Sequence, residues 1–177
     1  MKENCVPKTA CRLAATLNRK DIMKVQMSME EFLAELEQNR QGMLQYYCED
    51  GICRVENNTC EVNLKDDIGI VLQLSNETIP IVRMELLKKI LRDWSGYVEK
   101  ALHFLKGYRI DLGADYFPCG IYVGEFSYGT YGFRIFDGFM ISLKRGDGTD
   151  EDFLNLDVYT VQFKADGRPI GVVLWFE

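Results

Sequence analysis

The chain has 177 residues, of which 47% are hydrophobic, 12% are aromatic and 27% are charged, and its formal net charge is −6. This length and composition predict one globular domain with a sizeable core and exclude a chain that is largely disordered. The acidic balance argues against a nucleic-acid partner, because affinity for nucleic acids comes largely from Lys and Arg side chains that displace counterions from phosphates.

Residues 1–24 form a basic segment with only two acidic residues. Its basic residues are Lys2, Lys8, Arg12, Arg19, Lys20 and Lys24. We expect a mobile N-terminal arm here and a single α+β domain over residues 25–177. A transit peptide would have a similar composition and is the alternative. The longest apolar stretch of the segment, residues 13–17, is far shorter than the core of a signal peptide.

Six cysteines are scattered along the chain. They are Cys5, Cys11, Cys48, Cys53, Cys60 and Cys119. No two of them have the two-residue separation that is typical of zinc sites, so we expect thiols in the cytoplasm and no metal or other cofactor. No stretch approaches the roughly 20 apolar residues of a membrane-spanning helix, so we expect no membrane partner.

The first predicted helix begins at Ser28. Ser28 and Glu31 have the spacing of a capping box, and Met27 and Phe32 can pack around it. Next, residues 52–64 alternate like a hairpin that turns at Asn57-Asn58. A two-residue turn there pairs Val55 with Cys60, Cys53 with Val62 and Arg54 with Glu61. A third strand is predicted over residues 68–74.

Apolar residues then recur at spacings of three and four from residue 81 to residue 108, which is typical of a helix. Two interpretations stay open, because the stripe keeps its phase across Ser95-Gly96. The segment is either one long helix or two helices that are separated at Gly96.

Strands and turns replace helices after residue 108. A strand is predicted over residues 120–128, and the alternation from Phe133 to Leu143 continues through Asp137-Gly138, which indicates either a hairpin turn or, preferably, a bulge. Asp166-Gly167 predicts a final hairpin. A two-residue turn there gives the pairs Phe163–Ile170, Val161–Val172 and Tyr159–Leu174.

These elements predict an α+β fold. We expect an antiparallel sheet of about six or seven strands, packed against a long or broken central helix and an N-terminal helix. A small acidic α+β chain of this general plan resembles bacterial immunity proteins, and the resemblance implies a non-catalytic protein that binds a basic partner.

Few residues suggest catalysis. The single histidine, His103, falls on the polar side of its helix, so we expect it to be exposed rather than catalytic. Glu125 and Asp137 each interrupt an apolar strand face. With Tyr122 and Phe126 they form an alternative site, the aromatic-lined pocket of a carboxylate-dependent hydrolase or small-ligand binder. The competing interpretation, which we favour, is an edge position, a bulge, or a basic partner such as Arg134 or Arg109.

The segment 145–157 is acidic, and its spacing does not fit a calcium loop. Its acidic residues are Asp147, Asp150, Glu151, Asp152 and Asp157. We therefore hypothesise a protein-binding module that engages a basic partner through these residues, with no catalytic site and with an oligomeric state that the sequence leaves open.

Overall fold

The computed structural model describes residues 27–38, 54–56, 58–65, 67–76, 78–110, 116–128, 134–145 and 158–175. Its helices are α1 (Met29–Gln38), α3 (Ile81–Arg92) and α4 (Trp94–Gly107). Its strands are β1 (Arg54–Glu56), β2 (Thr59–Asn63), β3 (Gly69–Gln73), β4 (Tyr116–Tyr128), β5 (Arg134–Arg145), β6 (Val158–Lys164) and β7 (Pro169–Trp175). The expected basic arm lies outside the described residues.

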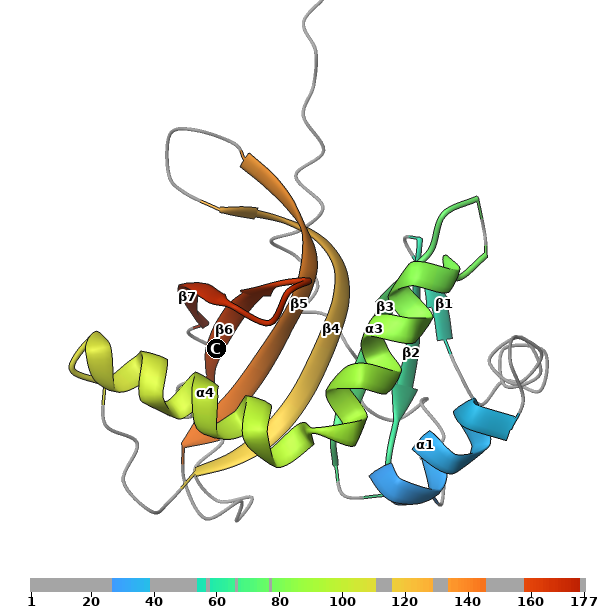
Figure 1. The fold of residues 1–177 in the computed structure, drawn as a ribbon, viewed down its shortest axis with the longest axis horizontal. Coiled ribbons are helices and arrows are strands. Elements are labelled where there is room, and N and C mark those ends of the chain that lie inside the picture. Colours follow the sequence, from blue (N-terminus) through green and yellow to red (C-terminus); the bar gives the residue numbers. More distant parts are fainter. Residues whose placement is uncertain are drawn as a thin grey trace, which may run out of the picture.

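The strands form one sheet in chain order, from β1 at one edge to β7 at the other (Figure 1). Neighbouring strands are antiparallel except for β3 and β4, which are parallel. The parallel pair corrects the expectation of a fully antiparallel sheet. It arises because α3 and α4 carry the chain from the end of β3 back to the start of β4, as a parallel connection requires.

The N-terminal helix begins as its sequence predicts. The Ser28 amide donates to Glu31 Oε2 at 2.8 Å, and the Glu31 amide donates to Ser28 Oγ at 3.3 Å, which completes the capping box. The buried side chains Phe32 and Leu36 face the rest of the molecule, and α1 packs on α3. No helix within the described ranges is long and apolar enough to cross a membrane.

The first hairpin has the predicted register. Val55 pairs with Cys60 and Arg54 with Glu61, which confirms the two-residue turn, while Cys53 lies outside the described residues. Asn58 takes the positive φ of 66° that such a turn needs. Its side-chain amide also donates to the Leu74 carbonyl at 2.8 Å, so the turn is fixed to the end of β3.

The helical segment that follows consists of two helices, and they meet at Asp93 rather than at Gly96. Asp93 leaves the helical conformation with φ −122° and ψ 40°. Gly96 lies in the first turn of α4, where a Cβ atom would overlap the Asp93 carboxylate. The glycine therefore marks a close contact with the residue at the helix boundary, and not the boundary itself.

Asp137-Gly138 is neither a turn nor a bulge, because β5 continues through it. Asp137 pairs with Glu125 and Gly138 with Gly124 in unbroken register. A Cβ atom on Gly138 would overlap the carbonyl oxygen of Phe163 on β6. The glycine is thus explained by the close approach of a neighbouring backbone, which sequence alone does not distinguish from turn chemistry.

The final hairpin follows the predicted pairing except beside its turn. Val161 pairs with Val172 and Tyr159 with Leu174, but Phe163 pairs with Pro169 instead of Ile170. The Gly167 amide donates to the Lys164 carbonyl, and the Lys164 amide donates to the Arg168 carbonyl. With Gly167 at φ 89°, this is a three-residue loop closed by a glycine bulge, which shifts the register by one residue.

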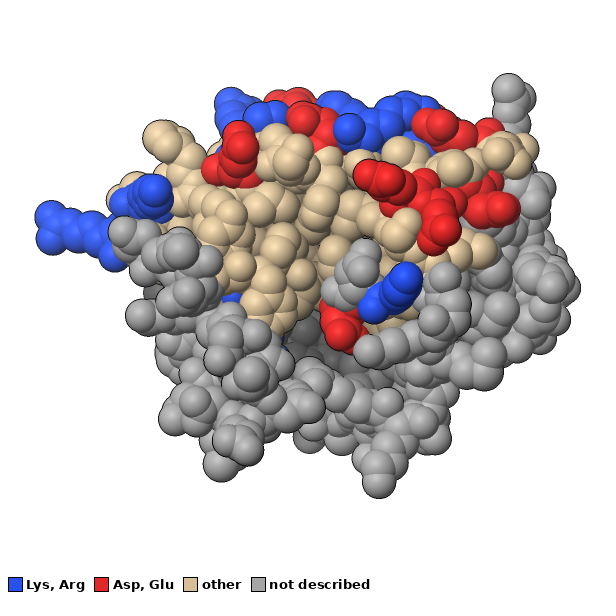
Figure 2. All heavy atoms as spheres, turned by 90° about the horizontal axis from the view of Figure 1, so that it is seen from below, with Lys and Arg blue, Asp and Glu red and all other residues tan. Residues whose placement is uncertain are grey.

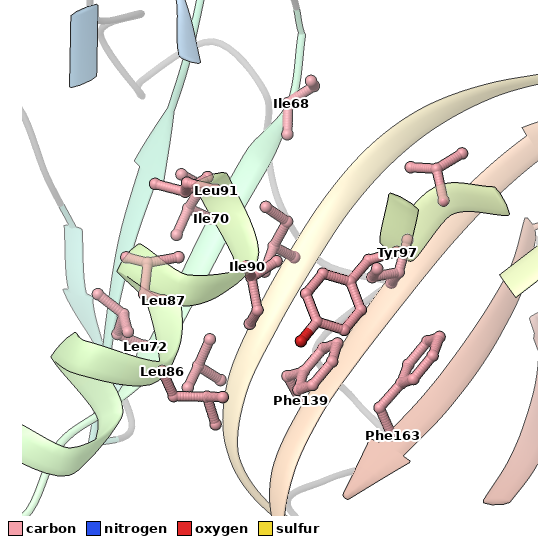
Figure 3. Close-up of a cluster of buried hydrophobic side chains, with 14 of the residues drawn as sticks. Ile68, Ile70, Leu72, Leu86, Leu87, Ile90, Leu91, Tyr97, Phe139 and Phe163 are labelled. Atoms are coloured by element: carbon pink, nitrogen blue, oxygen red, sulfur yellow. The ribbon is translucent and has the colours of Figure 1, made fainter. Parts of the chain in front are cut away.

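The core lies between the helices and one face of the sheet (Figure 3). The ring of Phe139 stacks on that of Phe163, with centroids 4.7 Å apart and an interplanar angle of 3°. Tyr97 of α4 meets Phe139 edge to face at 5.2 Å. On the β3 side, Ile70 and Leu72 face Leu87 and Ile90 of α3 (Figure 3). This apolar layer joins both helices to both halves of the sheet.

Candidate functional site at the end of the parallel strands

The parallel strands β3 and β4 separate after the pair Leu72–Val123. Among the described residues, β4 continues beyond this point with β5 as its only partner, up to the pair Tyr128–Arg134. The Gln73 side chain lies where the strands part, and its Oε1 accepts the Glu125 amide hydrogen at 2.7 Å. Functional sites in sheets with parallel strands commonly lie at such carboxyl ends.

Arg83, from the first turns of α3, reaches into this opening. Its guanidinium is buried, and Nη1 donates to the Gln73 carbonyl at 3.0 Å. Nη2 lies 3.5 Å from Glu125 Oε1, and Nε lies 3.6 Å from Asp137 Oδ1. Glu125 and Asp137 are direct cross-strand partners, so the β4–β5 register presents both carboxylates to one guanidinium.

The two carboxylates are about half exposed, at 53% and 52%, whereas the arginine between them is buried. A glycosidase-type acid pair needs space between its carboxyl groups for the bond that is cleaved. Here the guanidinium of Arg83 occupies that position. The arrangement is therefore suited to fixing α3 against the β4–β5 ribbon, since it gives the arginine one hydrogen bond and two ion pairs.

The four residues of the predicted aromatic-lined pocket are divided between the two faces of β4 and β5. Glu125 and Asp137 face the helices, while Tyr122 and Phe126 alternate onto the other face. The Phe126 ring lies 6.3 Å from that of Phe136. The structure thus brings the two acids together but does not bring the aromatic rings into the same site.

The hydroxyl of Tyr122 lies near the acid pair and is hydrogen-bonded to the backbone of Glu125. It donates to the Glu125 carbonyl at 2.9 Å. Burial is the main cause that raises the Tyr122 pKa to about 12, while the nearby Arg83 lowers it. The hydroxyl therefore remains protonated near neutral pH and acts as a hydrogen-bond donor rather than as a base.

His103 is exposed on α4, as predicted. It lines a groove of about 410 Å³ between α4 and the start of β7, together with Gly96, Glu99, Lys100, Phe104 and Pro169. Its lining contains no serine, threonine or cysteine that His103 could activate as a nucleophile.

The predicted partner-binding residues Asp147, Asp150, Glu151, Asp152 and Asp157 lie outside the described residues. Figure 2 shows another accumulation of acidic side chains, on the side where α1 lies in Figure 1. The sequence of α1 contains four glutamates and no basic residue. These glutamates are Glu30, Glu31, Glu35 and Glu37. The sequence predicts Glu30, Glu35 and Glu37 on the outward face of this helix; Glu30 and Glu37 are exposed, and Glu35 is half-buried.

The expected basic partner of the two acids was Arg134 or Arg109, and the structure places Arg83 there instead. Arg83 is, with Lys88, one of two basic residues buried on α3. It precedes Leu86, Leu87 and Ile90 by three, four and seven residues, so it lies on the same helix face as these buried residues. A charged residue in that position needs a partner. Two acids that interrupt a strand face supply it.

No protein-family model matches this chain, and comparisons with the curated proteins and with the solved structures gave no significant match. What the site can do must therefore be argued from its own geometry.

Replacing Arg83 by Met is expected to lower the free energy of unfolding by about 1–3 kcal/mol, because the Gln73 carbonyl loses its hydrogen-bond donor and the two carboxylates lose their ion-pair partner. Urea denaturation measures the change. The matched control is Arg92→Met on the same helix, which removes an exposed ion pair with Glu37 and should cost less than about 0.5 kcal/mol. Equal losses in the two variants would contradict the anchoring role of Arg83.

Proposed function

We propose that this chain is a non-catalytic protein-binding module that engages a basic partner through its acidic surface. An immunity-like role, which the general plan of the chain suggests, belongs to the same proposal. The observation that carries it is α1, whose inner side is buried through Phe32 and Leu36 while Glu30, Glu31 and Glu37 are exposed. Arg92 pairs with Glu37, and Glu31 caps the helix, but α1 itself contains no basic residue. A surface with this excess of acidic side chains attracts basic surfaces and repels acidic ones.

The ion pairs of the two acidic residues in β4 and β5 support the same proposal. Glu125 and Asp137 are the two carboxylates that a hydrolase would use, and both are engaged by Arg83. The aromatic side chains Tyr122 and Phe126 alternate onto the opposite face of β4. A hydrolase or small-ligand pocket would need these groups to converge around an open space, and binding through the surface does not.

The test uses the full chain as bait to capture a partner, which is then purified and titrated at about 0.05 M and about 0.3 M salt. We expect a partner with a basic surface whose affinity falls with salt. Two neutralised variants locate the acidic surface, D150N/E151Q/D152N in the acidic segment and E30Q/E35Q in α1. Each should weaken binding by about tenfold, since two or three charge pairs are lost.

The α1 variant leaves Glu31 and Glu37 in place, because Glu31 caps the helix and Glu37 pairs with Arg92 at 2.8 Å. The control is Glu99→Gln, which removes an exposed carboxylate from α4 and should leave the affinity unchanged. If both acidic variants kept the affinity and the salt dependence of the unaltered chain, the proposal would be wrong.

A further inference from the structure

The sheet ends at β7, whose outer edge is unpaired among the described residues. β7 pairs with β6 on one side, and it is the last strand in the order β1 to β7 (Figure 1). An edge strand presents a row of backbone N–H and C=O groups that another strand can pair with. The question is whether this edge carries the features that prevent such pairing.

The two edges of the sheet differ in charge over the described residues. In β1, Arg54 and Glu56 are charged. Charged side chains are a common means of protecting an edge from another chain. The β7 edge has seven residues, Pro-Ile-Gly-Val-Val-Leu-Trp, and no charge. Pro169 and the bulge beside it protect the end near the turn, and no described residue protects the stretch from Gly171 to Trp175.

The side chains of β7 are apolar on both faces of the sheet. Val172 packs against the core on the helix side, and Leu174, on the same side, is 38% exposed. Val173 alternates onto the other face and is half-buried. A strand added at this edge would cover apolar side chains and would also satisfy backbone groups, which together favour association.

Helix α4 lies beside the same end of the sheet. It contacts both β6 and β7, and the groove of about 410 Å³ along α4 includes one residue of β7, Pro169, at the turn end of the strand.

The geometry points to a second copy of this chain as the occupant, with β7 pairing antiparallel to β7 of the other copy about a two-fold axis. A strand without charges can face itself without placing like charges opposite one another. Two-fold symmetry uses the same patch on both subunits. It also places both α4 helices on the same side of the extended sheet.

Sedimentation velocity on the full chain at several concentrations tests this inference, with Val173→Lys and Leu174→Lys as edge variants. The unaltered chain should form a dimer, and each lysine should raise its dissociation constant at least about tenfold, because it places like charges across the junction. The matched control is Ile135→Lys on β5, a side chain that is 68% exposed and should leave the dimer intact.

A second measurement does not depend on whether the variants fold. In the unaltered chain, hydrogen exchange at the β7 amides should slow as the protein concentration rises through the dissociation constant, while exchange at β2 stays constant. Any one of three results would overturn the inference. The chain could be monomeric at every concentration, both lysine variants could leave the dimer unchanged, or the hydrogen exchange at β7 could be independent of protein concentration. The inference does not rest on the proposed basic partner, which is tested with other variants.

Discussion

Replacing Phe139 by Ala should lower the free energy of unfolding by about 3–5 kcal/mol. Phe139 is fully buried at the centre of β5, where it stacks on Phe163 and meets the edge of Tyr97 (Figure 3). The substitution removes the ring that packs on both Tyr97 of α4 and Phe163 of β6. The surrounding backbone belongs to a paired strand and can close the cavity only in part, so both transfer and cavity contributions are lost.

Urea denaturation monitored by circular dichroism measures this effect. The control is Ile135→Ala, which shortens an exposed side chain on the same strand and should change the stability by less than about 0.5 kcal/mol. Phe139→Leu should fall between the two, since it keeps most of the apolar volume. Similar stabilities for the Phe139→Ala and Ile135→Ala variants would show that the aromatic cluster is not the centre of the core.

Replacing Gly138 by Ala should lower the free energy of unfolding by about 3 kcal/mol, near the upper end of the range for overpacking. The added methyl would overlap the Phe163 carbonyl oxygen, which belongs to the backbone of β6 and cannot rotate away. Relief requires β5 and β6 to move apart at the pair Gly138–Lys164, directly beside the stacked phenylalanines. Thermal unfolding of the variant measures the loss.

A second glycine provides the comparison. Gly107 is the last residue of α4, and a Cβ atom there would meet nothing within 4 Å. Gly107→Ala should therefore leave the stability unchanged or raise it by up to about 1 kcal/mol, through better helix propensity and a less flexible unfolded chain. A loss of the same size in both variants would contradict the steric explanation for Gly138.

Local rules predicted the parts of the fold that depend on neighbours in the chain. The Ser28–Glu31 capping box and the pairing of Arg54 with Glu61 are both present, because a cap and a two-residue turn are complete within a few residues. The last hairpin was predicted at its centre but not beside its turn. Its loop gained a glycine bulge, and the ring of Tyr97 lies against Gly167 there.

The candidate site was predicted only in part, for a related reason. Glu125 and Asp137 were singled out because they interrupt apolar faces, and the structure makes them cross-strand partners. Their contact with Arg83 joins segments more than 40 residues apart in the sequence. The spacing of residues along the chain does not predict a contact between such distant segments. The position of Arg83 on a buried helix face does indicate that it needs acidic partners.

The sequence by itself determined the class of the fold, the capped helix, the register of the first hairpin and the exposure of His103, since each follows from periodicity or turn chemistry that acts locally. Only the tertiary structure decided that β3 and β4 run parallel, that Gly138 accommodates a neighbouring backbone, and that two strand acids share a buried arginine. These features depend on which distant segments become neighbours. Which segments pack together depends on how the apolar surface of the whole chain is buried, and no single stretch of residues determines it.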